Sequence, residues 1–377
     1  MSKFMRVAYF ALAPFISGSE RSLQLLILHS KEKGIIPILV SPPDSPMHNW
    51  ARENQIPSFE CHLGIFSLKH PLLWLISRLK LILILKKNKI QIVHSNQIWS
   101  LPAAQIPSKV LNLKRVCHFR DPVNKEINWW LKGGLDCAIS ISKHIDRQIE
   151  KHIQPQLINA RETIINPINL DTGFDYSMSH TIKMEARKCL NLPLNTKIFG
   201  YIGQVTPVKG VTNIIKAFSA LPDSLQPMLL IAGDDTTEGK RYLADCKQLI
   251  DELNIENRVI FLGFMGDVRN FYNSVDVVVV HSKEEPLGRT PLEAGSYYKP
   301  TIATNVGGLP ETILHNKTGW LVNPELPEET ISAMKFCLSN DISNFGISAR
   351  NYVEEIAHPG RYADKIISIY KKLIKGY

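Results

Sequence analysis

The sequence predicts an α/β protein of two similar domains, each with a parallel sheet between layers of helices. The chain has 377 residues, which is too long for one ordinary hydrophobic core and indicates about two domains. Short runs rich in Val, Ile and Leu alternate with longer amphipathic stretches along almost the whole sequence. Because these runs are apolar without a break, they are typical of parallel strands that helices cover on both faces. The alternation occurs in two consecutive series of similar length, which predicts two Rossmann-like domains.

The first series contains five candidate strands. They are the runs RVAYFAL, IIPILVS, IQIVHS, KRVCHF and LDCAISIS, at 6–12, 35–41, 90–95, 114–119 and 135–142. The first run has a competing interpretation as part of a signal peptide, since Lys3 and Arg6 stand before apolar residues. We favour a buried strand, because an amphipathic helical pattern follows it at once, as in a βαβ unit.

The second series contains five more candidate strands, KIFGYIGQ, PMLLIAG, RVIFLGF, VDVVVV and PTIATN, at 197–204, 227–233, 258–264, 275–280 and 300–305. Between the series, 165–183 is rich in Asn, Asp, Ser and Thr and contains Pro167 and Gly173, which predicts a linker. We therefore expect an N-terminal domain over 1–175 and a C-terminal domain over 176–355. The last segment, 356–377, has the pattern of a basic amphipathic helix.

The composition is that of a folded soluble protein, with 44% hydrophobic and 21% charged residues. The six cysteines are scattered and form no C-x-x-C pair. This pattern argues against a disulfide framework or a zinc site and fits a reducing compartment. We therefore expect a cytoplasmic location and no metal or other cofactor.

The net charge of +9 is unevenly distributed. The first 180 residues contain 22 Lys and Arg against 13 Asp and Glu, whereas the remaining residues contain 22 of each kind. Between Cys61 and Leu135 there are 12 basic and 2 acidic residues. We expect this stretch to face an anionic partner. No nucleic-acid-binding motif accompanies the charge, so nucleic acid is not the partner we expect.

The segment HPLLWLISRLKLILILKKNK, at 70–89, is unusually apolar for a helix. Its longest uninterrupted apolar run is five residues, which is too short to span a bilayer. One interpretation is a buried core or interdomain helix. The other is a helix that lies on an anionic membrane surface through Trp74, the leucines and the basic residues Arg78, Lys80, Lys86, Lys87 and Lys89.

Parallel sheets bind ligands at the carboxyl ends of their strands, so the residues after each run are the candidate site. After the first run, Gly18 and a helix that begins near Ser19 could bind a diphosphate through backbone N–H groups, although for this loop taken alone an ordinary capped turn is the favoured interpretation. His118, at the end of KRVCHF, is a candidate sugar ligand or a structural histidine. After KIFGYIGQ, Gln204 and Lys209 flank a turn, and Lys209 is a candidate phosphate clamp or a solvated lysine.

The segment HSKEEPLGRTPLEAGS, at 281–296, places Glu285 and Glu293 on either side of a glycine turn. The backbone N–H groups of Gly288, Arg289 and Thr290 could cradle an anion at the start of a helix. Glu285 precedes that helix and Glu293 lies about one turn into it, so one could face a sugar and the other a ribose diol. The competing interpretation is that both acids only stabilise the positive N-terminus of the helix.

The region SKEEPLGRTPLEAGSYYKPTIATNVGGLPETILHNKTGWLV, at 282–322, closely resembles the signature of the group 1 glycosyltransferases (glycosyltransferase family 4). The segments GYIGQVTPVKGVTNIIKAF, LLIAGDD and VIFLGFMGDVRNFYNSVDVVVVHS fall in the family's order, so the resemblance covers essentially the second half. In the first half it is weaker: ISGSERSLQLL resembles the family's Gly-Gly loop and IINPINLD its linker strand.

The resemblance implies a GT-B fold, in which two Rossmann-like domains face each other across a cleft and a C-terminal helix crosses back to the first domain. It also implies metal-independent, retaining transfer of a sugar from a nucleotide-diphosphate donor, and the sequence has no D-x-D metal motif. On the family pattern, Glu285 lies at the donor sugar and Glu293 at the ribose. The amides after Gly288 and those near Gly18 hold the diphosphate. Phe264 and Met265 line the base pocket. His118 lies beside the sugar and the reacting face.

One position departs from the family pattern, because Gln204 stands where an arginine is usual ahead of Lys209. Arg and Lys together would neutralise the charge that develops on the leaving diphosphate. Gln can donate hydrogen bonds but has no charge. A slower enzyme, a compensating cation such as Arg289, or a different donor preference would each accommodate the change.

We expect a transferase that moves a hexose or N-acetylhexosamine to a glycan or lipid-linked acceptor. The basic first half favours an acceptor at the inner face of a membrane, as in surface polysaccharide or lipopolysaccharide assembly. The alternative is a catalytically weak or inactive homologue that still binds nucleotide sugars.

Overall fold

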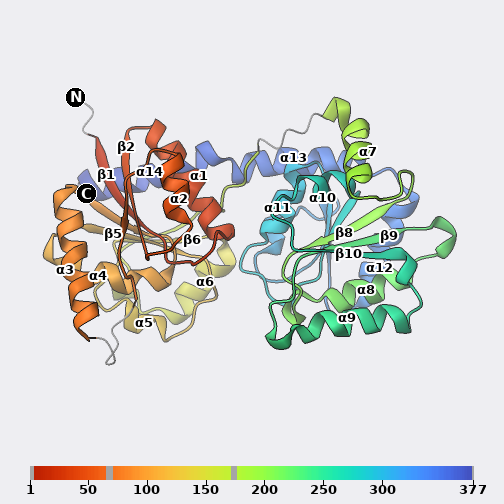
Figure 1. The fold of residues 1–377 in the computed structure, drawn as a ribbon, viewed down its shortest axis with the longest axis horizontal. Coiled ribbons are helices and arrows are strands. Elements are labelled where there is room, and N and C mark those ends of the chain that lie inside the picture. The colour runs from red at the N-terminus through yellow and green to blue at the C-terminus, as the bar shows by residue number, and fades with distance from the viewer. Residues whose placement is uncertain (1–3, 65–70, 171–175, 376–377) are drawn as a thin grey trace. The chain divides into compact units, whose positions relative to one another are not determined.

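The computed structural model describes residues 4–64, 71–170 and 176–375. The chain forms two compact units (Figure 1). Unit 1 consists of Met1–Pro167 and Pro359–Tyr377, and unit 2 of Ile168–His358. The domain boundary predicted between 175 and 176 adjoins residues 171–175, which lie outside the described residues. Gly173 of the predicted linker is one of them.

Unit 1 is built on a seven-stranded, fully parallel sheet in the order β3-β2-β1-β4-β5-β6-β7. The strands are β1 Met5–Phe10, β2 Ile35–Ser41, β3 Ser58–Glu60, β4 Ile92–Ser95, β5 Lys114–Phe119, β6 Cys137–Ser140 and β7 Arg161–Thr163. All five strands expected from the first series are present, and the first apolar run is indeed a buried central strand. The two edge strands, β3 and β7, were not predicted, because three partly or fully exposed residues leave no apolar run to detect.

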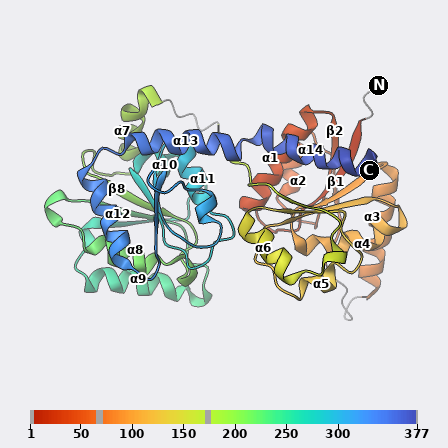
Figure 2. The ribbon, with the colours of Figure 1, turned by 180° about the vertical axis from the view of Figure 1, so that it is seen from behind.

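Helices cover both faces of this sheet (Figures 1 and 2). Along β1, Val7 and Tyr9 pack in the core beneath one helical layer, and Ala8 and Phe10 in the core beneath the other, as alternating strand residues must. The first layer contains α1 Gly18–Glu32, α2 Met47–Glu53 and α14 Pro359–Lys375. The second contains α3 Pro71–Lys87 and α4 Leu101–Val110. Two further helices, α5 Ile127–Trp130 and α6 Lys143–His152, connect the later strands.

The C-terminal helix α14 belongs to the core of unit 1 although it follows unit 2 in the sequence (Figure 2). Tyr362, Ile366 and Tyr370 are fully or almost fully buried against the sheet and α1. The return of the last helix to the first domain, predicted with the fold class, is therefore confirmed.

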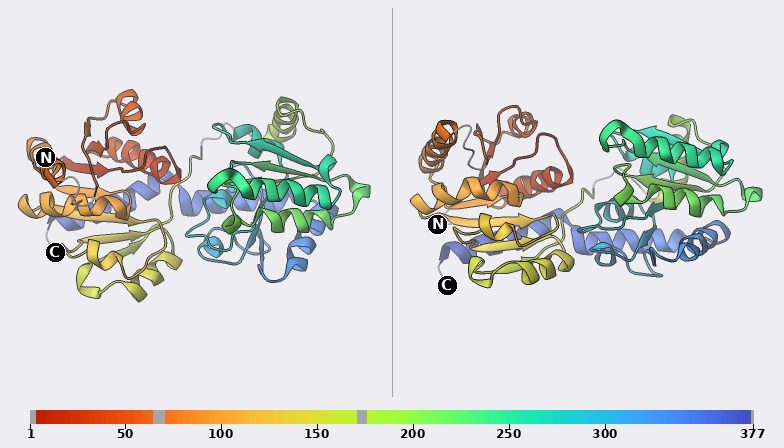
Figure 3. Two further views of the ribbon diagram at one scale, coloured as in Figure 1. Left: turned by 60° about the horizontal axis from the view of Figure 1, so that its bottom comes forward. Right: turned by 90° about the horizontal axis from the view of Figure 1, so that it is seen from below.

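Unit 2 is built on a six-stranded parallel sheet in the order β10-β9-β8-β11-β12-β13. Its strands are β8 Ile198–Ile202, β9 Met228–Ala232, β10 Val259–Gly263, β11 Val277–Val280, β12 Thr301–Thr304 and β13 Gly319–Val322. One face packs against α8 Val211–Ser219, α9 Arg241–Glu252 and α12 Pro327–Ser339 (Figures 1 and 3). The other side carries α7 Ser179–Cys189, α10 Arg269–Ser274, α11 Arg289–Ser296 and α13 Ser343–Ala357.

Each sheet has one point where its strand order reverses. In unit 1 the chain builds outward from β1 to β3 and then returns to place β4 on the other side of β1. In unit 2 it builds outward from β8 to β10 and then places β11 beside β8. At such a point the loops leave the sheet in opposite directions, and the crevice between them is where doubly wound sheets bind ligands. We therefore expect ligand-binding or catalytic sites at the carboxyl ends of β1 and β4 and of β8 and β11.

Candidate functional site

A lysine and a glutamate meet at the reversal point of unit 2. Lys209 follows β8 and Glu285 follows β11, and the Lys209 Nζ lies 2.6 Å from Glu285 Oε2. The hydroxyl of Ser282 also approaches Glu285 Oε2, at 3.4 Å. The Lys209 side chain is 27% exposed and the Glu285 side chain 17% exposed, so both groups remain within reach of a ligand.

Gly210 allows Lys209 to reach this position. Lys209 ends the short 3-10 turn Pro207–Lys209, and Gly210 then takes a left-handed conformation, with φ of 64°, as helix α8 begins. A Cβ on Gly210 would lie 2.2 Å from the carbonyl oxygen of His281, closer than any side chain allows. Glycine thus lets the turn after β8 pack directly against the end of β11.

Two glycines after β12 fix the backbone of Glu285. The N–H of Gly308 donates to the Glu285 carbonyl oxygen at 2.8 Å, and a Cβ on Gly307 would lie 2.0 Å from that same oxygen. The loops after β8, β11 and β12 therefore pack with no room for side chains between them. Glu285 is positioned by the backbone as well as by its ion pair.

Helix α11 begins four residues after Glu285, at the predicted anion cradle. Its N-cap is Gly288, whose φ of 99° belongs to the left-handed region, and its first residues are Arg289 and Thr290. A Cβ on Gly288 would come within 2.7 Å of a Leu309 methyl group, so space as well as conformation requires glycine. The N-terminus of a helix is electropositive and offers backbone donors, which suits the predicted phosphate cradle.

Glu293 lies one turn into α11, where both of its carboxylate oxygens have partners. Oε1 is 2.7 Å from the Arg289 Nε, and Oε2 accepts a hydrogen bond of 2.9 Å from the Tyr272 hydroxyl. Burial raises the pKa of Tyr272 well above its ordinary value, and the Glu293 charge adds to the shift. The guanidinium of Arg289 is therefore neutralised by Glu293, which weakens the suggestion that Arg289 compensates for the missing arginine at Gln204.

The remaining predicted donor residues of unit 2 lie at the carboxyl ends of other strands. Gln204 follows β8 with an exposed side chain, while its carbonyl oxygen accepts a 2.6 Å hydrogen bond from the Tyr201 hydroxyl. Phe264 follows the edge strand β10 and is 78% exposed. Met265, beside it, packs partly against the core under β9 and β10. The roles of these three residues in donor binding stay predictions.

Unit 1 has a polar network at its own reversal point. Ser17 caps α1, whose first residue is Gly18, and the Ser17 hydroxyl donates to Glu20 Oε2 at 2.5 Å. The fully buried Glu20 also receives a 3.3 Å hydrogen bond from Asn96, which follows β4. The start of α1 and the end of β4 are thereby tied together, and the predicted binding of phosphate near Gly18 stays a prediction.

Arg120 completes this network. It donates through its Nε to the Asn96 carbonyl oxygen at 2.9 Å and through a terminal nitrogen to Asn96 Oδ1 at 3.0 Å. Its other terminal nitrogen lies 2.5 Å from Asn166 Oδ1. Neither Arg120 nor Asn96 was predicted as a site residue from the sequence. Their position directly after two neighbouring strands was the signal that could have identified both.

The ring of His118 lies inside unit 1 in this structure, and its predicted contact with the sugar stays a prediction. His118 is fully buried in β5, and its ring shares hydrogen bonds with His94, at 2.6 Å, and with the Tyr362 hydroxyl of α14, at 2.9 Å. Burial lowers its pKa well below the ordinary value, and the Arg120 charge lowers it further. The reason is the strand's alternation: His118 shares the α14 side with Val116, whereas Arg120 lies beyond the strand's end.

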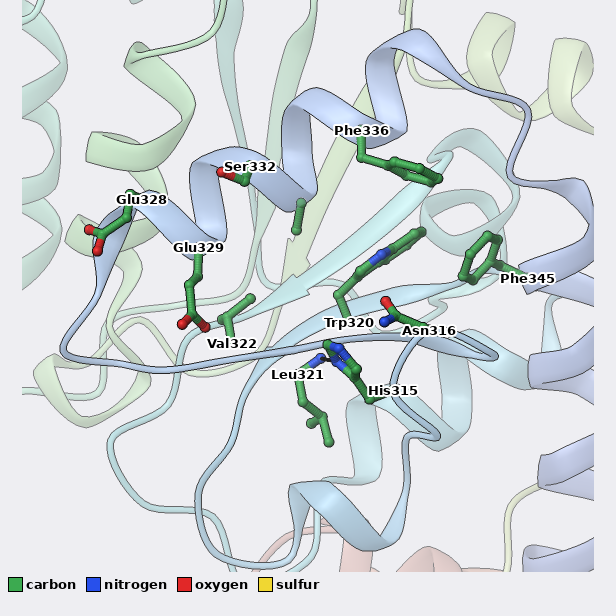
Figure 4. Close-up of a pocket in the computed structure, with 11 residues that line it drawn as sticks. His315, Asn316, Trp320, Leu321, Val322, Glu328, Glu329, Ser332, Phe336 and Phe345 are labelled. Carbon is green, nitrogen blue, oxygen red and sulfur yellow. Dashed lines mark hydrogen bonds between the residues drawn. The ribbon is translucent and has the colours of Figure 1, made fainter.

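A cavity of about 750 Å³ in unit 2 lies apart from these residues, beside the edge strand β13 (Figure 4). Trp320 of β13, Phe336 of α12 and Phe345 of α13 form its aromatic side, with the Trp320 and Phe345 rings stacked 4.5 Å apart. Glu329 accepts a hydrogen bond from the Asn323 N–H at 2.7 Å, so it serves the fold there. None of the predicted site residues lines this cavity.

Comparison with known proteins assigns unit 2 to a family. Residues 183–357 match the family model described as "Glycosyl transferases group 1". The chain is also 30% identical over 220 residues to an uncharacterized glycosyltransferase of Methanocaldococcus jannaschii, a match that covers 56% of this chain and 53% of that protein. Residues 183–357 thus form a group 1 glycosyltransferase domain, and the resemblance inferred from the sequence is confirmed. The chain spans about half the length of the curated relatives it matches.

Solved structures extend the likeness of fold to the whole chain. The crystal structure of Anabaena HepE in complex with UDP and glucose matches with a TM-score of 0.82 at 19% identity, covering 98% of this chain and 100% of that one. WaaG, a glycosyltransferase involved in lipopolysaccharide biosynthesis, matches with a TM-score of 0.69 at 17% identity, covering 96% and 99%. Together with these matches, the two helix-covered parallel sheets of seven and six strands confirm the predicted GT-B fold class.

Proposed function

We propose that this protein is a retaining glycosyltransferase that moves a hexose or N-acetylhexosamine from a nucleotide-diphosphate donor to a glycan or lipid-linked acceptor. The observation that carries the proposal is the Lys209–Glu285 pair at the reversal point between β8 and β11. We propose that Lys209 is the cation for the diphosphate and Glu285 the carboxylate for a sugar hydroxyl, as the resemblance to group 1 glycosyltransferases implies.

In the proposed donor complex, the diphosphate lies between the Lys209 ammonium and the N-terminus of α11. An anion there would compete with Glu285 for Lys209 and so free the carboxylate to accept hydrogen bonds from the sugar. Glu293 would accept from the ribose, since a carboxylate oxygen with one partner retains acceptor capacity. Phe264 and Met265 are proposed to line the base pocket. The complex of HepE with UDP and glucose supports this class of donor.

In the proposed reaction, the acceptor hydroxyl oxygen forms a bond to the anomeric carbon while the bond from that carbon to the diphosphate oxygen breaks. The bonding electrons and the acceptor's proton leave with the nucleoside diphosphate. Lys209 and the amides after Gly288 stabilise the negative charge that develops on the leaving group. We propose attack from the face that the diphosphate leaves, which retains the anomeric configuration, and we propose no metal requirement.

The acceptor is proposed from charge. The stretch from Cys61 to Leu135 has 12 basic and 2 acidic residues, so a phosphate-bearing or otherwise anionic glycan fits it better than a neutral one. A place in surface polysaccharide assembly follows from the same argument, and the role of WaaG in lipopolysaccharide biosynthesis supports it.

A second candidate function rests on Gln204. Without a charge at this position, leaving-group stabilisation depends on Lys209 and backbone dipoles, and a weak or inactive homologue that binds nucleotide sugars would tolerate that loss.

The test is to incubate the protein with a panel of nucleotide-diphosphate sugars and candidate acceptors, and to measure nucleotide release together with product mass. The proposal predicts nucleotide release and an acceptor that gains one sugar mass, with an unchanged anomeric configuration and equal rates with and without a chelator. Nucleotide binding without release across the panel would instead support the inactive homologue.

A further inference from the structure

Helix α3 is apolar on both of its faces, which is unusual for a helix at the surface of a folded protein. Its inner face packs Leu81 and Leu85 into the core of unit 1. Its opposite face exposes six large apolar side chains, each between 48% and 72% exposed: Leu72, Leu73, Leu75, Ile76, Leu79 and Leu83. We call these six residues the outer face of α3. A surface helix ordinarily carries polar residues there.

The outer face forms one continuous strip. At about 100° per residue, Leu72, Ile76, Leu79 and Leu83 fall on a single line along the helix. In helical projection, Lys86 lies on the Leu75 side of this line, and Lys80 and Lys87 lie on the Leu73 side. Along the axis, Lys86 and Lys87 stand in the last turn of the helix. The helix contains no acidic residue. An apolar strip with a basic border is the pattern of a helix that lies at the interface of a membrane.

The neighbouring helix α4 also exposes apolar residues. It packs against α3 and exposes Ile106 and Val110, with Lys109 between them. Both helices lie at the periphery of unit 1 (Figures 1 and 2). A contiguous apolar surface of this kind marks an interaction site, because scattered single residues would need no explanation but a strip does.

Arg78 and Trp74, which the sequence suggested for membrane contact, make contacts within unit 1. The Arg78 guanidinium donates to the backbone carbonyl oxygens of His62 and Gly64, and the side chain is 3% exposed. Its guanidinium carbon lies 5.4 Å from the centre of the Trp74 ring. Arg78 therefore holds α3 to the preceding loop, and the outer face is available without it.

We propose that the outer face of α3 docks on an anionic phospholipid bilayer. The leucines would enter the boundary between headgroups and acyl chains, while the bordering lysines stay at the level of the lipid phosphates. A second copy of the chain is a poorer occupant, because it would bring the two lysine borders together. None of the helices within the described residues is long and apolar enough to cross a membrane. The inference goes beyond the proposed sugar transfer, since α3 contributes nothing to the Lys209–Glu285 site.

The test measures co-sedimentation of the full-length protein with vesicles of phosphatidylcholine containing 30% phosphatidylglycerol, at low salt. We expect binding that weakens in pure phosphatidylcholine and at high salt. The triple variant Leu72→Ser, Ile76→Ser, Leu83→Ser should bind at least tenfold more weakly. The triple variant Lys80→Gln, Lys86→Gln, Lys87→Gln should bind roughly 100-fold more weakly, from the usual contribution of each lysine near an anionic surface.

Matched control variants alter the same residue types elsewhere. Leu194→Ser, Leu225→Ser, Leu326→Ser removes three exposed leucines from unit 2, and Lys188→Gln, Lys216→Gln, Lys335→Gln removes three exposed lysines. Both controls should bind vesicles like the unaltered protein. Because every altered side chain is exposed, circular dichroism should show the same melting temperature for all four variants to within a few degrees.

A fluorescent label locates the contact. Among the six cysteines, Cys189 is exposed and the others are buried, so Cys189→Ser, Leu83→Cys provides one reactive thiol on the outer face. An environment-sensitive dye there should brighten on anionic vesicles, whereas the same dye in Cys189→Ser, Leu225→Cys should not. Failure of the unaltered protein to sediment at low salt would overturn the proposal. Vesicle binding by the Leu→Ser and Lys→Gln triple variants of α3 that equals binding by the unaltered protein would also overturn it. So would a dimer that forms without vesicles and that the leucine variant abolishes.

Discussion

At the scale of single residues, the proposed site depends on one ion pair whose two members stand 76 positions apart in the sequence. The glycines at 210, 307 and 308 let the backbones of three loops approach closely, which places Lys209 and Glu285 side by side. A sequence pattern proposed each residue for the site on its own. It could not show that the two charges meet, because their distance is set by how β8 and β11 lie side by side.

Replacing Lys209 by Met should reduce kcat for nucleotide release by about 100-fold or more, the usual loss when one group that stabilises transition-state charge is removed. The same substitution leaves Glu285 without its ionic partner, so nucleotide diphosphate binding should weaken as well. Steady-state kinetics with a nucleotide-diphosphate sugar measures both effects. Lys216→Met, on the exposed surface of α8, is the control and should have unchanged kinetics.

Gln204→Arg should raise kcat by about tenfold, since it restores a charge where the family pattern has one. The exposed side chain of Gln204 leaves space for the longer group. Gln204→Met, of similar volume and without charge, should not raise kcat. An arginine variant with unchanged or lower turnover would show that this protein compensates in another way.

At the scale of elements, the long apolar runs predicted every central strand, and the failures lie where tertiary contacts override local pattern. β3 and β7 are short and exposed, so nothing in their composition distinguishes them from loops. His118, near the end of a strand, was left open as a sugar ligand or a structural histidine. Its neighbour in space is α14, about 240 residues later in the chain, and no local pattern could reveal the Tyr362 contact.

The contact of α14 with the sheet should make unit 1 sensitive to acid. His94 shares hydrogen bonds with Tyr370 of α14 and with His118, and burial lowers its pKa to about 3. Between about pH 6.5 and pH 3 the His94 imidazole therefore binds a proton in the unfolded chain but not in the folded chain. The free energy of unfolding should fall by up to about 1.4 kcal/mol per pH unit for each such histidine as the pH drops through this window.

Urea unfolding at pH 7, 5.5 and 4.5 measures that dependence. His94→Gln keeps a hydrogen-bonding side chain but cannot titrate, so its midpoint should be lower at pH 7 and should decline less steeply with acid. His180→Gln, at an exposed position, should follow the unaltered protein. Parallel declines in His94→Gln and the unaltered protein would contradict the assignment.

At the scale of the whole molecule, the two series of strands and helices were enough to predict two parallel α/β units. The family signature also predicts where the site of unit 2 lies, and that location stays a prediction. The site of unit 1 was not predictable in the same way. Its network joins Glu20, Asn96, Arg120 and Asn166, four residues from four separate segments that only the folded sheet brings together. The outer face of α3 was ambiguous for a related reason, since a helix that is apolar all round could be buried or docked.

The central claim is that the reversal point between β8 and β11 binds the diphosphate of a nucleotide donor. Isothermal titration calorimetry of the full-length protein with UDP, GDP, ADP and CDP tests it most directly, because binding requires no acceptor. We expect one of these nucleotides to bind with a single site, and Lys209→Met to weaken that binding at least tenfold while Lys216→Met does not. Equal affinity in Lys209→Met, or no binding of any of the four, would contradict the claim.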